Sequence, residues 1–296
     1  MPADSPRTLR AIFKPDKSAV VDELVDALAG TDWVVERMPT DDPDDVSRFA
    51  AEAAPSGADA VATVGGDGSL SLMLDGMLDG GLPLLIVPAG TVNLTAQIVG
   101  IDTVAAAAAA LVAGETRRID LGLDGHETFV INASSGYDAA VIDDAHDHSD
   151  ARFGRLHFAV AAVRRLRRDR PRSVVVEVDG DVMFDGRAMS VIVMNAGQRA
   201  SKSLDVAPDA AMDDGLLDVA VSRVATLPAA ARVILRLVRG NEISRSDIVR
   251  SQGRTVDVRW GSEQATQRDG AGTPPRRAIS YGIRPDAIDL VVGPTA

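Results

Sequence analysis

The sequence predicts a two-domain protein, in which an α/β domain with a parallel sheet is followed by a β-sandwich domain. Over the first 118 residues, short apolar runs alternate with amphipathic stretches, the pattern of βαβ units. From Arg117 onward the chain changes to short β segments separated by Asp-Gly turns. Its 296 residues exceed one typical domain, and 46% of them are hydrophobic, which provides material for two cores.

The α/β domain is expected to contain four strands and four helices in alternation. The first helix is the clearest, because Val21, Leu24, Val25 and Leu28 fall on one helical face. Parallel strands joined by helices bind ligands outside their carboxyl ends, so the turns after the strands are the places to search for function. The expected strands are 9–13, 33–35, 61–65 and 84–87, and the expected helices are 20–28, 46–54, 69–78 and 103–113.

The second half is predicted to be mainly β, with two helices at 153–168 and 227–239. Its strands are expected at 129–131, 174–178, 190–194, 216–221 and 287–292. Asp-Gly pairs at 179–180, 185–186 and 214–215 predict turns between strands. The segment 261–277 is rich in Gly, Pro and Arg, so we expect a mobile loop before the last strand.

Composition narrows the possible partners and compartments. The net charge of −12 and the pI near 4.8 argue against nucleic acid as a partner, because its phosphates are repelled by an acidic surface. The chain has no cysteine, no secretory leader pattern and no apolar run long enough to span a bilayer. We therefore expect a cytoplasmic protein whose membrane contact, if any, is peripheral at the inner face. The oligomeric state stays open, with a homodimer as one option.

A glycine-rich turn follows the third predicted strand and contains Gly65, Gly66, Asp67, Gly68 and Ser69. Glycines allow backbone N–H groups to close around phosphate oxygens, and the helix expected from Ser69 directs its positive end to the same place. Asp67 supplies the oxygen ligands that Mg²⁺ prefers. The alternative is an ordinary turn after a strand.

A second turn follows the fourth predicted strand and contains Gly90, Thr91 and Asn93. The carboxyl ends of parallel strands share one edge of the sheet, so this turn is expected beside the first one. Its N–H groups and side chains would donate to the same phosphates. Asn93 has a structural alternative, in which it caps a helix that starts at Leu94.

Several motif blocks occur in one order along nearly the whole chain. They are Gly65-Gly66-Asp67-Gly68-Ser69, Pro88-Ala89-Gly90-Thr91-Val92-Asn93-Leu94, Ile119-Asp120-Leu121-Gly122, Ser135-Gly136-Tyr137-Asp138, Asp213-Asp214-Gly215-Leu216 and Gln267-Arg268-Asp269-Gly270. Together they resemble the diacylglycerol kinase catalytic domain family of bacterial lipid kinases, which is related to sphingosine kinases and NAD kinases. Ordered blocks are far more specific than one glycine loop.

The resemblance implies a NAD kinase/diacylglycerol kinase-like fold. A nucleotide-binding domain would comprise residues 1–118 with the returning segment 281–296, and a β-sandwich lipid-substrate domain residues 119–280. The implied reaction transfers the γ-phosphoryl group of ATP, bound with Mg²⁺, to the hydroxyl of a lipid such as diacylglycerol. The implied partners are therefore ATP and a lipid substrate.

The resemblance also assigns residues. ATP would be bound by the two glycine turns together with Lys14 and Pro15, and Asp67 would hold the catalytic Mg²⁺. A second, structural Mg²⁺ would use Asp214 with the carbonyl groups of Ala211 and Leu216, and Asp213 and Asp218 are nearby alternatives. The run Asp213-Asp214-Gly215 is also ordinary turn chemistry.

Catalysis is where this chain departs from the family pattern. The family has an Asp-Gly-Glu motif whose glutamate takes the acceptor proton, and here the residues are Asp269-Gly270-Ala271. Asp269 is the candidate that remains. The other departures are Lys14 for an asparagine, Ser69 for a threonine and Ser71-Leu72 for an Asn-Glu pair. A NAD kinase-like enzyme and a nucleotide-binding regulatory protein with little turnover are therefore kept as alternatives.

Two charged segments fall outside these motifs. The basic run 164–170 would attract anionic lipid headgroups, or it is a solvated helix end, and the sequence does not separate the two interpretations. The segment 143–150 contains His146 and His148 and could in principle bind a transition metal. A solvated loop is the better prediction, because no third histidine or cysteine accompanies them.

Overall fold

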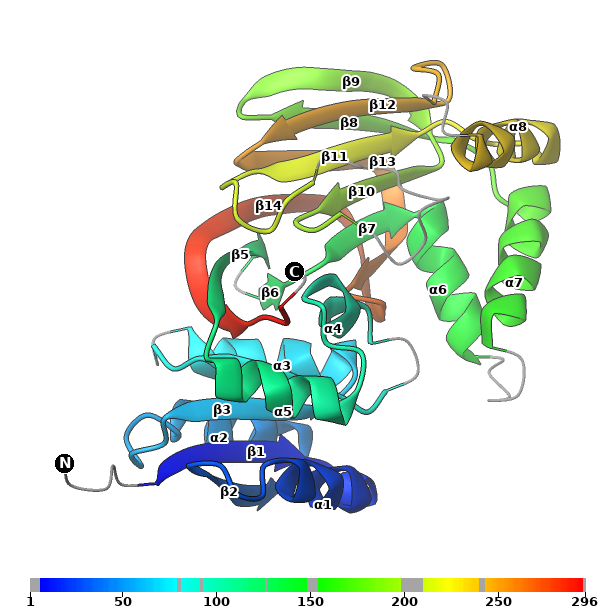
Figure 1. Cartoon of the computed structure of the whole chain (residues 1–296). Coiled ribbons are helices and arrows are strands. Elements are labelled where there is room, and N and C mark those ends of the chain that lie inside the picture. The colour runs from blue at the N-terminus through cyan, green and yellow to red at the C-terminus, as the bar shows by residue number, and fades with distance from the viewer. Residues whose placement is uncertain are drawn as a thin grey trace. The chain divides into compact units, whose positions relative to one another are not determined.

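The structure is a computed structural model that describes residues 6–78, 81–90, 93–125, 127–147, 154–197, 210–239 and 243–294. The chain forms two compact units. The first unit contains Met1–Asp120 and Pro285–Ala296, and the second contains Leu121–Arg284. The predicted fold class, an α/β domain followed by a β-sandwich-like domain, is confirmed (Figure 1).

The first unit is built on a parallel sheet. Its strands lie in the order β4, β3, β1 and β2, and the C-terminal end of β14 (Ala271–Val291) joins beside β4 through the pairing of Leu290 with Leu84. All six residues of β3 are buried, as expected for a strand covered on both faces. The strand bounds are β1 Arg7–Phe13, β2 Trp33–Pro39, β3 Ala60–Gly65 and β4 Leu84–Pro88.

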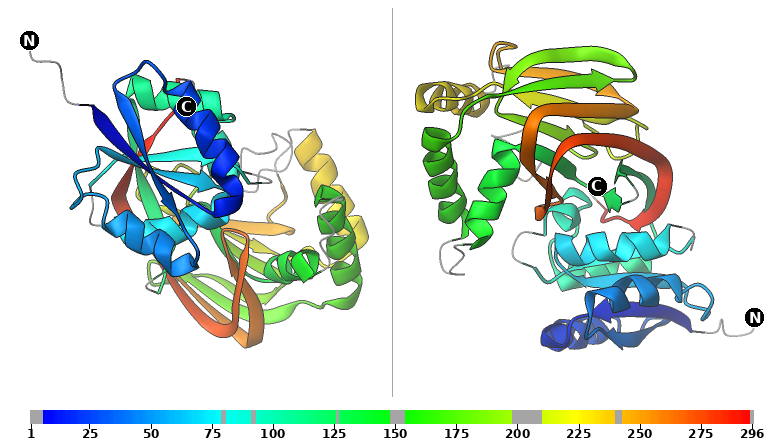
Figure 2. Two further views of the ribbon diagram at one scale, coloured as in Figure 1. Left: turned by 90° about the horizontal axis from the view of Figure 1, so that it is seen from below. Right: turned by 180° about the vertical axis from the view of Figure 1, so that it is seen from behind.

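Helices cover both faces of this sheet, as Figure 2 shows. Helix α1 packs with α5, and α2 packs with α3. The crossovers β1–β2 and β2–β3 run in opposite directions across the sheet, so α1 and α2 lie on opposite faces. The bounds are η1 Pro15–Lys17, α1 Ser18–Ala27, α2 Pro43–Ala51, α3 Asp67–Met77, α4 Leu94–Ile98 and α5 Val104–Ala113.

The strand order creates a topological switch point in the first unit. Strand β1 has β2 on one side and β3 on the other, so the chain departs in two directions from this point. In α/β sheets the crevice outside the carboxyl ends of such strands binds ligands. The register pairs Phe13 with Val64 and Gly65 with Pro88, so the turns after β1, β3 and β4 leave the sheet at one level.

The second unit is a sandwich of antiparallel strands. One path runs β12, β11, β10, β7, β13 and β14, and β8 pairs with β13 on one side and β9 on the other. Alternate residues of these strands fill a core of valines around Trp260 and Phe129. The strands are β5 Thr116–Asp124, which crosses from the first unit, β6 Glu127–Phe129, β7 Asn132–Gly136, β8 Arg172–Val178, β9 Asp181–Ala188, β10 Ser190–Met194, β11 Leu217–Ser222, β12 Ile248–Gly253 and β13 Thr255–Arg268.

Three helices accompany this sandwich, and none of the described helices is long and apolar enough to span a membrane. Helix α6 packs against α7, and Figure 1 shows α7 and α8 beside one another at one end of the unit. The bounds are α6 Tyr137–Asp147, α7 Gly154–Arg168 and α8 Leu227–Val238.

The structure corrects four expectations about local structure. Of the strand expected at 129–131, only Phe129 lies in a strand, at the end of β6. The segment 261–277, expected as a mobile loop, instead belongs to a long β13–β14 hairpin and includes its tip. The Asp185-Gly186 pair lies inside β9, not in a turn. Residues 143–147 belong to helix α6 and not to a loop, and His148 to Asp150 lie outside the described residues.

Candidate functional site

Asp67 links the two glycine turns of the first unit. It is the first residue of α3, and its carboxylate accepts hydrogen bonds from the Leu94 N–H at 2.9 Å, the Thr95 N–H at 2.9 Å and the Thr95 hydroxyl at 2.8 Å. These N–H groups begin α4 and have no partner within that helix. The carboxylate therefore caps α4 across 27 residues of sequence, and its charge complements the positive end of the helix.

Asn93 does not perform the capping role that was its structural alternative. It occupies the position before α4 with φ of 53°, in the left-handed region, and its side chain makes no cap hydrogen bond. Instead its Oδ1 accepts from the Gly90 N–H at 2.8 Å and its Nδ2 donates to the Gly90 carbonyl at 3.0 Å. Asn93 thus closes the second glycine turn, and Asp67 supplies the cap.

The two turns touch through their glycines. A Cβ atom on Gly90 would lie 2.6 Å from the Gly66 Cα and 2.8 Å from the Asn93 Oδ1, so a side chain at Gly90 has no room. A Cβ on Gly68 would meet no heavy atom within 4 Å. Gly68 therefore faces open space at the start of α3, where backbone N–H groups without helical partners can receive an anion.

Lys14 and Pro15 follow β1 at the same edge of the sheet. Both are exposed, and Pro15 begins the short η1 helix. The structure thus places the predicted residues Lys14, Pro15, Gly65, Gly66, Asp67, Gly68, Ser69, Gly90 and Asn93 at one edge, while Thr91 lies outside the described residues. A cavity of about 480 Å³ adjoins this edge and is lined by Pro88, Asn93, Gln97, Gly100, Ile101 and Asp102.

In the second unit, Asp269 occupies the tip of the β13–β14 hairpin. Its φ is 46°, and its carboxylate accepts from the N–H groups of Val130 at 2.8 Å, Ile131 at 2.8 Å and Asn132 at 3.0 Å. The Asp269 N–H donates in return to the Asn132 carbonyl at 2.8 Å. This carboxylate joins the hairpin to the start of β7, and its function as a general base remains a prediction.

Ala271 follows this tip and is exposed. A carboxylate lies near it, because an ideal Cβ on Gly272 would come within 2.2 Å of the Asp143 Oδ1 on helix α6. Successive side chains of a strand point to opposite faces, however. Asp143 therefore lies on the face of β14 that Ala271 does not share, and it does not replace the glutamate of the family motif.

The predicted structural metal site around Asp214 has the geometry of a turn. The Asp214 Oδ1 accepts from the Leu216 N–H at 2.9 Å, and Gly215 between them has φ of 72°. Among the described residues, no group of three or more His, Cys, Asp or Glu side chains gathers in a way that could hold a metal ion. A site made of Asp214 and the carbonyl groups of Ala211 and Leu216 is not of that kind, so it remains a prediction.

The structure also contains a buried polar network to which sequence reasoning gave no role. Ser134 donates to the Asp138 Oδ2 at 2.6 Å, and Gln267 donates to Ser134 at 2.9 Å and to the Asn132 Oδ1 at 2.6 Å. Burial raises the pKa of Asp138, while the Ser134 hydroxyl opposes this. Asn132, Ser134 and Asp138 are polar residues within a mainly apolar stretch, and this was the signal available in the sequence.

Two family models match the chain. The diacylglycerol kinase catalytic domain matches residues 14–123, and the YegS C-terminal NAD kinase beta sandwich-like domain matches residues 131–292. The chain belongs to the diacylglycerol kinase family. The first match contains both glycine turns and Lys14, and the second contains Asp138, Asp214 and Asp269.

Curated relatives and solved structures agree with membership of the diacylglycerol kinase family. The chain is 26% identical to a diacylglycerol kinase of Bacillus subtilis (strain 168), over 90% of this chain and 87% of the relative. It is 30% identical to a diacylglycerol kinase of Mycobacterium tuberculosis (strain ATCC 25618 / H37Rv), over 73% of this chain and 72% of the relative. A crystal structure of a diacylglycerol kinase from Bacillus anthracis str. Sterne superposes with a TM-score of 0.70 at 18% identity, covering 99% of both chains, which supports the fold.

Proposed function

We propose that this chain is a lipid kinase that transfers the γ-phosphoryl group of ATP to a lipid hydroxyl, with diacylglycerol or a related lipid as acceptor. One observation carries the proposal most of all. In a member of the diacylglycerol kinase family, two interlocked glycine turns stand at the carboxyl edge of a parallel sheet with open space at Gly68. Phosphoryl transfer depends mainly on positioning and charge neutralisation, and such turns provide both.

Each residue of this edge has a defined task in the proposal. The N–H group of Gly68 receives a phosphate oxygen, and Lys14 brings a positive charge to the same edge. Asp67 holds the two turns in register through α4. Its three hydrogen bonds leave room for one more ligand on its oxygens, which fits a hard cation. Bound there, Mg²⁺ would neutralise phosphate charge.

A nucleotide-binding protein with little turnover is the second candidate, and a specific observation favours it. The carboxylate of Asp269 is engaged by three backbone N–H groups, and Ala271 carries no acid or base. A base must be able to reach the proton of the acceptor. The two candidates share nucleotide binding and differ in turnover.

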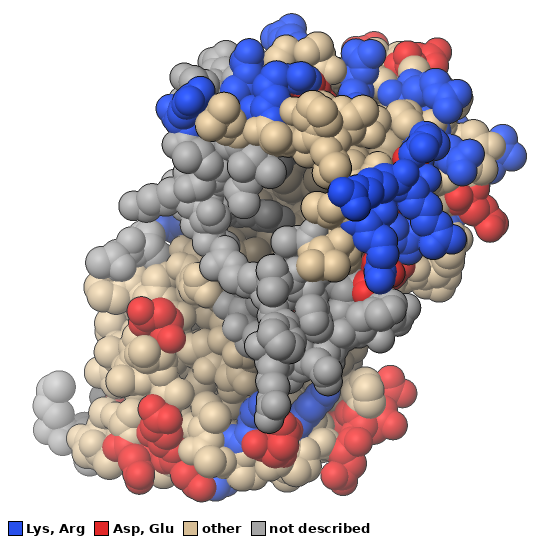
Figure 3. Space-filling view, turned by 90° about the vertical axis from the view of Figure 1, so that its right-hand side faces the viewer, with Lys and Arg blue, Asp and Glu red and all other residues tan. Residues whose placement is uncertain are grey.

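Access to a lipid acceptor is proposed to occur through helix α7. Val160 and Val163 are 55% and 40% exposed, and with Arg164 and Arg167 they line a shallow groove on one side of the helix. Figure 3 shows a dense group of Lys and Arg side chains on the face of the molecule that it presents. Exposed apolar side chains beside arginines suit an anionic lipid surface.

The activity is tested by incubating the protein with Mg²⁺, γ-labelled ATP and diacylglycerol in mixed micelles. The expected result is labelled phosphatidate. A parallel reaction contains NAD in place of diacylglycerol. Labelled NADP in that reaction would instead identify a NAD kinase-like enzyme. If ATP binds and neither acceptor is labelled, the binding protein with little turnover is the correct function.

The phosphate-binding turn is tested by two matched glycine variants. Gly68→Ala adds a methyl group to open space in a helix, so the free energy of unfolding should stay equal or rise by about 0.5–1 kcal/mol. Its ATP affinity should nevertheless fall at least tenfold, because the methyl group stands where phosphate is proposed. Gly90→Ala should lose stability as well as affinity. Wild-type ATP affinity in Gly68→Ala would exclude this turn as the phosphate site.

The membrane face is tested by sedimentation with vesicles of phosphatidylglycerol or phosphatidylcholine. Arg167→Glu and Val160→Asp should each weaken binding to phosphatidylglycerol vesicles at least fivefold. Arg250→Glu makes the same charge change as Arg167→Glu at an exposed position of β12 and is the control. Equal losses in all three variants would show a general charge effect and reject α7 as the contact.

A further inference from the structure

Helix α7 presents a second set of arginines on its other side. Arg164 and Arg167 lie along the exposed groove with Val160 and Val163, at spacings of three and four residues. Arg165 and Arg168 each come one residue later, so the rotation of the helix turns them toward a different surface. There they line a separate cavity of about 400 Å³. This volume falls within the range of small-molecule sites.

The cavity is lined by residues of the second unit only. Its walls are the end of α7, the segment that follows it, the start of α6, and β13. Four arginines line it, Arg165, Arg168, Arg170 and Arg172, against two carboxylates, Asp169 and Glu263. The whole chain has a net charge of −12, so this concentration of cations runs against the general composition.

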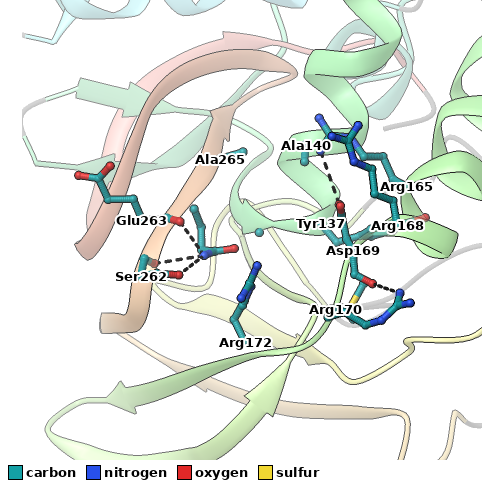
Figure 4. Close-up of a pocket in the computed structure, with 13 residues that line it drawn as sticks. Tyr137, Ala140, Arg165, Arg168, Asp169, Arg170, Arg172, Ser262, Glu263 and Ala265 are labelled. Carbon is teal, nitrogen blue, oxygen red and sulfur yellow. Dashed lines mark hydrogen bonds and ion pairs between the residues drawn. The ribbon is translucent and has the colours of Figure 1, made fainter.

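The carboxylates leave part of this charge available. Asp169 lies 3.6 Å from Arg165, an i,i+4 ion pair. Glu263 points away from the arginines in Figure 4. Among the described residues, no carboxylate forms an ion pair with Arg168 or Arg172, and Figure 4 shows the Arg172 side chain directed into the cavity. The cavity therefore contains guanidinium groups whose hydrogen-bond donors can serve a ligand.

The floor and rim are held in place by hydrogen bonds. The Tyr137 hydroxyl donates to the Ala162 carbonyl at 2.6 Å, which ties α6 to α7. Burial, with help from Asp138 and Asp169, raises the pKa of Tyr137 to about 12, so the hydroxyl keeps its proton at neutral pH. Arg170 donates to the carbonyls of Arg167 at 3.1 Å and Asp169 at 2.9 Å, which fixes the segment after α7. The site is thus built before a ligand arrives.

We infer that this cavity is a phosphate-binding site, which takes either the phosphate headgroup of an anionic lipid or a free phosphate compound. Guanidinium groups match the planar, bidentate geometry of phosphate oxygens and bind them by charge-assisted hydrogen bonds. A site of this kind is separate from the proposed nucleotide turns, which belong to the first unit. Binding here is measured without any turnover, so it does not depend on the kinase function being correct.

The test is isothermal titration of the full chain with inorganic phosphate and with glycerol 3-phosphate, in sodium chloride of constant ionic strength. We expect saturable binding, with the affinity reduced at least tenfold in the Arg168→Gln/Arg172→Gln double variant. Both side chains are exposed at their outer parts, so the variant should fold, and its melting temperature checks this. Arg250→Gln removes one exposed arginine from β12 and should keep the wild-type affinity within twofold.

The Gly68→Ala variant separates the two candidate phosphate sites. It should retain full phosphate affinity at the arginine cavity. No saturable binding by the wild-type protein, loss of binding in Gly68→Ala, or an equal loss in Arg250→Gln would each overturn the inference.

The source of the phosphate group is found by adding vesicles. If the headgroup of a lipid is the ligand, phosphatidylglycerol vesicles compete with glycerol 3-phosphate, phosphatidylcholine vesicles compete less, and the double variant loses this competition. If a soluble compound is the ligand, glycerol 3-phosphate binds equally with and without vesicles. Both results support a phosphate-binding site in the cavity, and they differ only in whether a lipid or a soluble compound carries the phosphate group.

Discussion

The turn at Asp67 in the first unit and the turn at Asp269 in the second use a carboxylate in the same way. Each side chain accepts three hydrogen bonds from residues far away in the sequence. They differ in their donors. Asp67 receives two backbone N–H groups and the hydroxyl of Thr95 at a helix start, whereas Asp269 receives three consecutive N–H groups before a strand. Family motif carboxylates thus hold the framework together in both units.

The different donors of Asp67 and Asp269 predict different roles for the two carboxylates. The N–H groups of Val130, Ile131 and Asn132 belong to buried residues, so water cannot replace Asp269 as their acceptor. The helix at Leu94 is short, and Leu94 is only partly buried whereas Thr95 is buried, so water can replace the bond from Leu94 to Asp67 but not those from Thr95. Removal of Asp269 should therefore act on stability first, while removal of Asp67 should act on the candidate nucleotide site as well.

The largest expected effect comes from Asp269→Ala. Three buried N–H donors lose their acceptor, and the free energy of unfolding should fall by about 4 kcal/mol. Urea denaturation followed by circular dichroism measures it. Asp269→Asn keeps one oxygen and tolerates the positive φ, so about half of this loss is expected. Equal stability of Asp269→Ala and the wild type would contradict the proposed hydrogen bonds.

Asp67→Ala is the matching test in the first unit, with a loss of about 2 kcal/mol expected from the missing helix cap. Asp67→Asn preserves the shape of the side chain and should lose less stability. Its rate of phosphoryl transfer should nevertheless fall about 100-fold if the charge of Asp67 holds the cation. Stability and turnover are measured on both variants. A loss of turnover that is no larger than the loss of stability explains would mean that Asp67 has only a structural role.

Most of the first unit could be predicted because its signals are local. The helix at Ser18–Ala27 and the strand at Ala60–Gly65 each follow from apolar spacing within about ten residues. The glycine turns could be placed at one sheet edge because parallel strands share their carboxyl ends. The tasks of Asp67 and Asn93 could not, because they depend on partners that only the folded chain brings near.

The second unit was harder to predict for the same reason. Pro, Gly and Arg in 261–277 indicated a loop. Pairing with β13 nevertheless keeps β14 extended, and the exposed residues of β14 include Pro, Gly and Arg, as they would in a loop. Gly186 resembles a turn residue and lies in β9, opposite Val174. The arginine cavity combines residues more than 90 positions apart in the chain. Cross-strand contacts of this range have no signature in a single sequence.

Thr95→Val tests the one feature that distinguishes the Asp67 cap from the Asp269 cap. The threonine is 1% exposed, and valine keeps its shape while it removes the hydroxyl donor. The free energy of unfolding should fall by about 1.5 kcal/mol, the lower end of the contribution of one hydrogen bond to a charged group. Because the two N–H donors to Asp67 remain, ATP affinity should change less than twofold. A loss as large as that of Asp67→Ala would mean that the hydroxyl dominates the cap.

Asp138 is a third carboxylate, and its removal should not lower stability at neutral pH as the removal of Asp67 or Asp269 should. Asp138 is partly buried, burial raises its pKa, and among the described side chains the Ser134 hydroxyl donates a hydrogen bond to it. The folded-state pKa lies above the unfolded one, so its protonation adds stability as the pH falls through the folded value, and this gain is complete below the unfolded value of 3.8. At neutral pH the buried charge gives no such gain.

The smallest change in stability at neutral pH is therefore expected for Asp138→Asn. The amide keeps an acceptor for Ser134 and removes the buried charge, so the free energy of unfolding should stay within about 1 kcal/mol of the wild type, or rise. Urea titrations from pH 7 down to pH 4 measure the difference between the two proteins. The wild type should gain stability relative to Asp138→Asn as the pH falls. A constant difference across this range would show that folding does not raise the pKa of Asp138.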